Sequence, residues 1–169
     1  KLYNAFKLKT DEKDIQLRLS IDEAMPEFIY GDQVRLNQIL NNLLSNAVKF
    51  TEKGRIIISI KVINRDVDTV TLLFSVQDTG IGIAKHKIDD IFSSFQQETS
   101  STTRKYGGTG LGLTISKQLV ELQGGKMNVE SEKNLGSTFS FHLTYSITPK
   151  AAVEKEKAQQ VEKDNQKDK

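Results

Sequence analysis

Hydrophobic and polar positions follow two clear periods in the first third of the chain. Residues 15–21 alternate between apolar and polar side chains, the period-two pattern of a strand with one buried face. Residues 36–48 instead carry leucine, isoleucine, alanine and valine at helical spacing over four turns, and Asp32 is a good N-cap before them. We therefore predict a helix from just after Asp32 to near Phe50, with Gly54 just beyond its end.

The rest of the chain continues with segments of both kinds. In order, the pattern predicts a short strand at 28–30, a hairpin of strands at 55–63 and 70–78, a helix at 85–94, a loop at 96–109, a helix from Gly110 to Leu122 stopped by Gly124-Gly125, and two strands at 126–131 and 137–146. Strands adjacent in sequence should pair antiparallel, with helices covering one face. The expected fold class is α/β (α+β), a two-layer sandwich.

Composition sets the domain boundaries and excludes several classes of function. Residues 1–14 are polar without sustained periodicity and predict a linker, 15–148 form the domain, and 149–169 are a charged linker or tail. The net charge of +2 gives no reason to expect nucleic acid as a partner. The absence of cysteine excludes disulfides and thiolate metal sites and is compatible with a cytoplasmic location.

No apolar run approaches the roughly 20 residues that a membrane-spanning helix needs. Because the chain begins at Lys1 rather than methionine, we expect it to be a piece of a longer protein, whose membrane anchor, if it has one, lies outside this segment.

The first cluster of candidate chemistry is a polar face on the predicted helix at 33–50. Asn42 and Asn46 are four residues apart and Lys49 follows three later, so all three project from the side opposite the leucine stripe. Amide oxygens beside an ammonium group suit a magnesium ion that is already bound to phosphates. The alternative interpretation is an ordinary solvated helix face.

The second cluster, Asp78-Thr79-Gly80-Ile81-Gly82-Ile83, ends a predicted strand. A carboxylate in this position can accept a hydrogen bond from an exocyclic amino group, and the glycines let the backbone pass close to a flat ring. The alternative is a simple strand–turn–helix connection, in which Asp and Gly are common anyway.

Two further glycine clusters follow. The segment 107–113 opens a helix, where backbone N–H groups and the helix dipole favour an anion. Its spacing is neither that of a P-loop nor that of the dinucleotide fingerprint. Gly136-Ser137-Thr138 offers a hydroxyl and a close backbone approach at the start of the last strand, and alone it predicts no more than a turn.

Together and in this order, the clusters resemble the catalytic ATP-binding domain of sensor histidine kinases. The corresponding boxes are the N box at Asn42–Phe50, the first glycine box at Asp78-x-Gly80-x-Gly82, the F box at Phe92-x-x-Phe95, the second glycine box at Gly108-x-Gly110-x-Gly112, and the last at Gly136-Ser137. The resemblance covers about residues 12–147, and residues 100–117 look most like those of hybrid kinases, which often carry a receiver domain. It implies the Bergerat (GHKL) fold, a mixed, mostly antiparallel sheet covered on one face by about three helices.

The resemblance also implies a role for each matching position, with ATP and Mg²⁺ as cofactors. Asp78 would accept from the adenine amino group, Asn46 and Asn42 would hold Mg²⁺, and Lys49 and Arg104 would contact phosphate oxygens. The implied nucleotide-binding set is Asn42, Asn46, Lys49, Phe50, Asp78, Gly80, Gly82, Ile83, Gly108, Thr109, Gly110, Leu111, Gly112, Leu113 and Ser137.

Within the wider family, Asn42 favours a histidine kinase over a hydrolytic ATPase. Hydrolytic members usually place a glutamate there, because water needs a base during attack, whereas neutral imidazole already offers a lone pair. The predicted catalytic set is Asn42, Lys49 and Arg104. Two alternatives remain: an ATPase of the same fold, and a nucleotide-sensing module without transfer activity.

The acceptor histidine is expected to lie outside this chain. Neither His86 nor His142 has the acidic neighbour and flanking helix of the family's phospho-acceptor motif. The resemblance therefore implies a protein-histidine kinase domain that is inactive in transfer without its dimerisation and phospho-acceptor domain. Its further partner would be a response regulator or a fused receiver domain, and the isolated domain should be a monomer.

Overall fold

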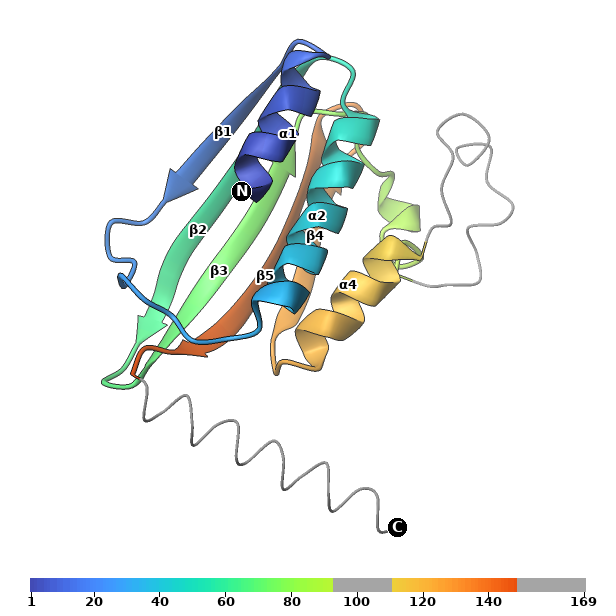
Figure 1. The fold of residues 1–169 in the computed structure, drawn as a ribbon. Coiled ribbons are helices and arrows are strands. Elements are labelled where there is room, and N and C mark those ends of the chain that lie inside the picture. Colours follow the sequence, from blue (N-terminus) through green and yellow to red (C-terminus); the bar gives the residue numbers. More distant parts are fainter. Residues whose placement is uncertain (93–110, 149–169) are drawn as a thin grey trace.

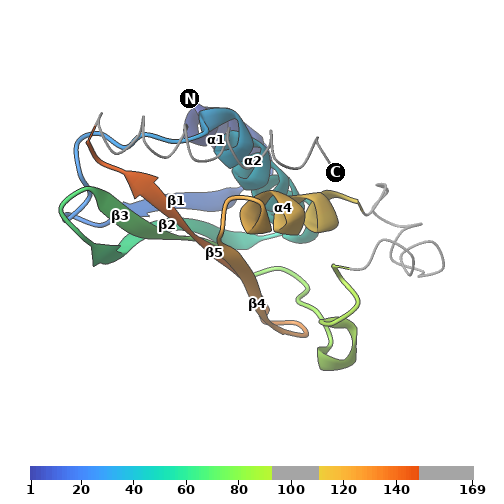
Figure 2. The same ribbon diagram turned by 90° about the horizontal axis from the view of Figure 1, so that it is seen from below.

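The computed structural model describes residues 1–92 and 111–148. Its elements are α1 (Leu2–Asp11), β1 (Ile15–Ile21), α2 (Gln33–Phe50), β2 (Gly54–Arg65), β3 (Thr69–Asp78), the short 3₁₀ helix η1 (Lys85–Lys87), α4 (Gly112–Glu121), β4 (Lys126–Glu132) and β5 (Gly136–Ser146). Figure 1 shows a single sheet with α1, α2 and α4 in front of it. Seen from below, these helices all lie on one side, so the domain has two layers (Figure 2). The predicted fold class is confirmed.

The five strands form one sheet in the order β1-β2-β3-β5-β4. The hairpins β2–β3 and β4–β5 are antiparallel as predicted, and β3 also pairs antiparallel with β5. The pairing of β1 with β2 is parallel, so the expectation that neighbours in sequence pair antiparallel is wrong for this pair. The reason is that α2 lies between them and crosses the sheet, which returns the chain to the end where β1 began.

The core lies between the sheet and the helices, and it follows the predicted periods. Alternate residues of β3 are buried from Val70 to Asp78, and the side chains between them face the other side of the sheet. Phe74 stacks on Phe141 of β5 with ring centroids 5.0 Å apart. The predicted N-cap of α2 is also confirmed, because the Asp32 side chain accepts from the backbone N–H of Arg35 at 2.9 Å.

The predicted linker at 1–14 is a helix over most of its length. In α1, Phe6 and Thr10 are buried against β1 and α2. The Lys13 ammonium group then donates to the carbonyl of Val48 near the end of α2, at 2.8 Å. Sequence periodicity missed this helix because one of its two buried positions is a threonine, whose hydroxyl donates to the carbonyl of Lys7. Whether the segment leads to another domain stays a prediction.

Two other predicted elements differ. The strand at 28–30 is reduced to one isolated bridge between Tyr30 and Ser146, and the next residue, Gly31, lies close against the ring of Tyr145. The helix predicted at 85–94 is a 3₁₀ turn followed by turns as far as Phe92, and its last two residues lie outside the described part. Its apolar residues are only partly buried, and a short segment without a buried face gains too little packing to form a full helix.

The predicted end of helix α4 at Gly124-Gly125 is confirmed. Gly124 has a φ of +77°, and the N–H of Gly125 donates to the carbonyl of Val120 at 3.0 Å. The loop predicted at 96–109 and the tail predicted from 149 lie outside the described residues. Across 1–92 and 111–148, no helix is long and apolar enough to cross a membrane.

Candidate functional site

Asp78 ends β3 on the face of the sheet that carries the helices. Its side chain is buried, with 8% of the residue exposed. The N–H of Gly80 donates to the carboxylate at 2.8 Å, and the backbone N–H of Ser137 donates to it as well. Burial raises the pKa of Asp78, and these two hydrogen bonds oppose the rise. The result is a desolvated acceptor group at the end of the central strands.

The turn after Asp78 fits tightly between α2 and the β4–β5 turn. The N–H of Ile81 donates to the carbonyl of Phe50 at 3.2 Å, and the carbonyl of Ile81 accepts from Asn134 at 2.8 Å. Gly82 has a φ of +63°, and a Cβ there would overlap the carbonyl oxygen of Glu132. Only glycine adopts this positive φ readily and also leaves room for that carbonyl oxygen. The close approach of the backbone therefore explains the second glycine of the cluster.

The polar residues of α2 lie on the same side of the sheet as the Asp78 side chain. Asn42, Asn46 and Lys49 are all partly buried. The amide nitrogen of Asn42 donates to the Ser116 hydroxyl in α4 at 2.7 Å. A Cβ at Gly112 would overlap the Asn42 amide oxygen. The Asn42 side chain therefore joins α2 to the first turn of α4, with its oxygen turned toward the glycine backbone.

Lys49 and Phe50 lie side by side at the end of α2. The Lys49 ammonium nitrogen is 5.1 Å from the centroid of the Phe50 ring, within the range of a cation–π contact. The carbonyl of Phe50 holds the turn after Asp78, as described above. The end of α2 thus lies directly beside the predicted base-binding turn.

The start of α4 belongs to the same region. Gly112 and Leu113 are in its first turn, and Leu111 precedes them with 43% of its surface exposed. The Thr114 hydroxyl donates to the carbonyl of Phe92 at 2.9 Å, which ties the predicted F box to α4. The remaining predicted residues of this segment lie outside the described part of the chain: Phe95, Arg104, Gly108, Thr109 and Gly110.

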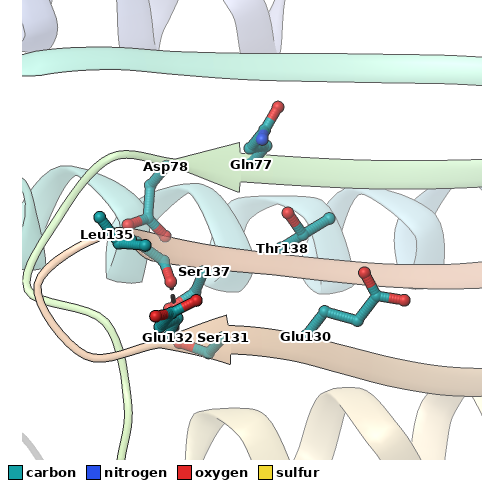
Figure 3. A pocket seen from close by; sticks show the side chains of 9 residues that line it. Gln77, Asp78, Glu130, Ser131, Glu132, Leu135, Ser137 and Thr138 are labelled. Carbon is teal, nitrogen blue, oxygen red and sulfur yellow. Dashed lines mark hydrogen bonds between the residues drawn. The ribbon is translucent and has the colours of Figure 1, made fainter.

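A cavity of about 350 Å³ lies where these strands end (Figure 3). Its border includes the inward residues Asp78, Ser131 and Ser137, and also Gln77, Glu130 and Thr138 on the strand phase that faces away from the helices. Ser137 is buried and pairs directly with Asp78 across β5 and β3. Its hydroxyl is 2.8 Å from that of Ser131.

Sequence reasoning missed two residues, Ser131 and Ser116. Each is a hydroxyl at a position that the apolar period assigns to the core. Ser131 follows Met127 and Val129 on the inward side of β4, and Ser116 is 1% exposed on the inner face of α4. A polar residue in a core phase was the signal that could have found them.

The two histidines lie apart from this region. His86 is exposed in η1, and His142 faces the side of the sheet without helices, paired with Leu73 and Lys126.

The residues of α2 that could hold a magnesium ion offer amide oxygens. Among the described residues, no group of three or more His, Cys, Asp or Glu side chains could hold a metal ion. Asn42 offers one such oxygen: Ser116 fixes its amide nitrogen, and the amide oxygen lies against the backbone of Gly112 at the start of α4. Asn46 presents a second amide one turn further along α2.

This fold and this arrangement define a two-layer α+β domain with a polar site at the end of its central strands, and comparison with known proteins specifies the family. Residues 31–147 match the family described as "Histidine kinase-, DNA gyrase B-, and HSP90-like ATPase". The chain belongs to this family. The predicted resemblance is confirmed, because its relatives and structural neighbours are sensor histidine kinases.

Two curated relatives illustrate the similarity. The chain is 46% identical over 136 residues to hybrid signal transduction histidine kinase B of Dictyostelium discoideum, covering 80% of this chain and 7% of that protein. It is 39% identical over 143 residues to the signal transduction histidine-protein kinase BarA of Escherichia coli (strain K12), covering 85% of this chain and 16% of that protein. The chain thus spans a small part of each.

Solved structures agree. Full-length ShkA, determined in complex with AMPPNP, superposes with a TM-score of 0.74 at 33% identity, over 87% of this chain and 29% of ShkA. The nucleotide-free catalytic domain of the histidine kinase ThkA superposes with a TM-score of 0.68 at 29% identity, over 89% of this chain and 90% of that domain.

Proposed function

We propose that this domain binds ATP with Mg²⁺ and, when a phospho-acceptor domain is supplied, transfers the γ-phosphate to a histidine. The observation that carries the proposal is the buried carboxylate of Asp78, held at the end of the sheet by a turn that bonds to the end of α2. Membership of the histidine kinase ATPase family and a neighbour solved with AMPPNP support it.

The base end of the site would be formed by Asp78 and the turn after it. A carboxylate that is desolvated and already fixed by two backbone N–H groups has lone pairs to offer and little freedom to lose on binding. It would accept a hydrogen bond from the exocyclic amino group of adenine. Gly80, Gly82 and Ile83 would line the base, and Phe50 would pack against its ring.

The phosphate end would lie between α2 and the start of α4. Asn46 and Asn42 would hold Mg²⁺, which supplies charge neutralisation at the phosphate oxygens when bound. Lys49 would contact phosphate, and backbone N–H groups at Leu111, Gly112 and Leu113 would favour the anion at the helix start. By resemblance, Arg104, Gly108, Thr109 and Gly110 would complete this end.

Asn42 argues for transfer to histidine over hydrolysis. An amide cannot take up a proton near pH 7, so this position supplies no general base to activate water. A neutral imidazole needs none. Its nitrogen forms a bond to the γ-phosphorus while the bond from that phosphorus to the bridging oxygen breaks, and the electron pair leaves with ADP.

A calorimetric titration with AMPPNP, with and without magnesium, tests the binding step. We expect magnesium to strengthen binding. The Asn46→Ala variant should lose most of that enhancement, whereas Asn41→Ala, an exposed amide on the same helix, should keep it. No binding at millimolar nucleotide would remove the proposal, and equal weakening of both nucleotide forms by Asn46→Ala would remove the metal role.

Transfer itself requires a phospho-acceptor domain added in trans. Labelled phosphate should appear on its histidine, with little release of inorganic phosphate from ATP. Rapid release without labelling would instead identify an ATPase, and binding without either product would identify a sensing module. The hybrid relatives support a fused receiver domain as a further partner. The proposal also includes a monomeric isolated domain in the cytoplasm.

A further inference from the structure

Ser131 has no role in the site described so far, yet its hydroxyl contacts three groups around the base end. It accepts from the backbone N–H of Ile83 at 2.8 Å. It donates to the carbonyl of Gly136 at 2.9 Å, and it lies 2.8 Å from the Ser137 hydroxyl. One side chain of β4 therefore connects the turn after Asp78 with the first two residues of β5. Figure 3 shows Ser131 beside Ser137.

Counting protons fixes the direction of these hydrogen bonds. A serine hydroxyl has one proton to donate and two lone pairs to accept. Ser131 uses its proton on the carbonyl of Gly136 and one lone pair on the N–H of Ile83. All three contacts are satisfied only when the Ser137 hydroxyl donates to the second lone pair. Ser137 is buried, and a buried hydroxyl strongly favours such a fully paired arrangement.

This direction determines what Ser137 can offer to a ligand. With its proton committed to Ser131, the Ser137 oxygen presents only lone pairs. It stands opposite Asp78 in the β3–β5 register, on the same face of the sheet, so the two side chains are direct cross-strand neighbours. The base end of the site then presents two acceptors and no side-chain hydroxyl donor from this pair.

We propose that Ser131 is a positioning residue that holds Ser137 as an acceptor, so that the site selects purine nucleotides with a 6-amino group over those with a 6-oxo group. The inference rests on the proposed nucleotide-binding function and adds a determinant of base selectivity to it. A 6-amino group donates protons to acceptors, whereas a 6-oxo group places its own lone pairs against them. Without Ser131, the Ser137 hydroxyl can rotate and donate to the oxo group.

The test measures the ratio of affinities for ATP and inosine triphosphate, which differ in this part of the base. We expect Ser131→Ala to narrow the ratio by about tenfold, the scale of one hydrogen bond near 1.4 kcal/mol. Ser131→Thr keeps the hydroxyl and should keep the ratio. Ser75→Ala, which removes a strand hydroxyl from the opposite face of β3, should also leave it unchanged.

A merely structural role predicts something else. If Ser131 only held the turn in shape, Ser131→Ala would weaken both nucleotides equally, and an unchanged ratio overturns the inference. Should Ser131→Ala fail to fold, Ser137→Ala gives the second measurement, because removal of the hydroxyl it orients should also narrow the ratio. If the wild-type chain binds ATP and none of the variants changes the ratio of affinities, only this inference is refuted. A wild-type chain that binds neither nucleotide refutes the proposed function as well.

Discussion

The paired strands β3 and β5 carry different kinds of inward side chains at their two ends. In the half containing Phe74 and Phe141, the inward side chains are valine, leucine, phenylalanine and tyrosine, and two rings stack at 5.0 Å. At the other end the inward pair is Asp78 and Ser137, a carboxylate beside a hydroxyl. Both ends are buried, but at the second end the whole inward pair is polar, and its burial costs free energy unless it is hydrogen-bonded.

The difference shows how one strand pair can serve both stability and chemistry. The apolar half supplies packing and needs no partner of defined geometry. The polar end is tolerated because backbone N–H groups of Gly80 and Ser137 and the hydroxyl of Ser131 satisfy it. Substitutions at the first end should therefore change stability, and substitutions at the second should change binding.

The largest effect on stability is expected from Phe141→Ala. Phe141 is 1% exposed, and its removal should lower the free energy of unfolding by about 3–5 kcal/mol. His142→Ala, the next residue on the opposite face, should cost well under that. Denaturant unfolding of both variants measures the difference. Equal costs would break the distinction between the two faces of β5.

Asp78→Asn should have the largest effect on binding. It replaces the charged acceptor with a group that presents a donor to the base, and the loss of a charged hydrogen bond corresponds to about 10- to 100-fold in affinity. Circular dichroism should show a folded domain while a nucleotide titration shows the loss. Unchanged affinity for ATP would mean that Asp78 does not contact the base.

The pH dependence of stability should sharpen the contrast next. Because the pKa of Asp78 is raised in the folded state, the folded chain holds this proton more tightly than the unfolded chain does. The stability that this group contributes is therefore full below the ordinary carboxyl pKa and declines as pH rises through the raised value. Unfolding measured across this range should show the decline in wild type, after subtraction of the Asp78→Asn profile. A difference profile of the opposite slope would contradict the assigned shift.

The smallest effect is expected from Tyr145→Phe, at the apolar end of β5. Its hydroxyl is buried and has no hydrogen-bond partner among the described residues. Removing an unpaired buried hydroxyl should leave thermal stability unchanged or raise it by up to about 1 kcal/mol. A loss of more than this amount would show that the hydroxyl is satisfied, and that the apolar end also contains a polar contact.

Much of this architecture could be predicted, because α2 and the two hairpins carry strong periodic patterns and a clear N-cap at Asp32. The failures share a physical origin. The helix α1 buries a threonine, the 85–94 segment has helical spacing but no buried face over its described residues 85–92, and the parallel β1–β2 pairing depends on the path of α2 over the sheet. Local pattern does not report these tertiary contacts.

The candidate site was predicted as a set of clusters and not as an arrangement. Sequence identified Asp78, the amides of α2 and the glycines, and their chemistry could be argued from residue type alone. It could not show that Asn42 bonds to Ser116 or that Ser131 contacts Ser137. Those contacts join different elements, and serine is too common on strands and helices to signal them.

The pairing of Asp78 with Ser137 has a consequence for how the domain folds. Each of the two hairpins can form from neighbouring residues, but β3 and β5 belong to different hairpins and meet only when these dock. The proposed base site therefore does not exist in any intermediate that contains the hairpins alone. A nucleotide that binds there would favour only the fully assembled chain, and so would retard unfolding without speeding the early steps of folding.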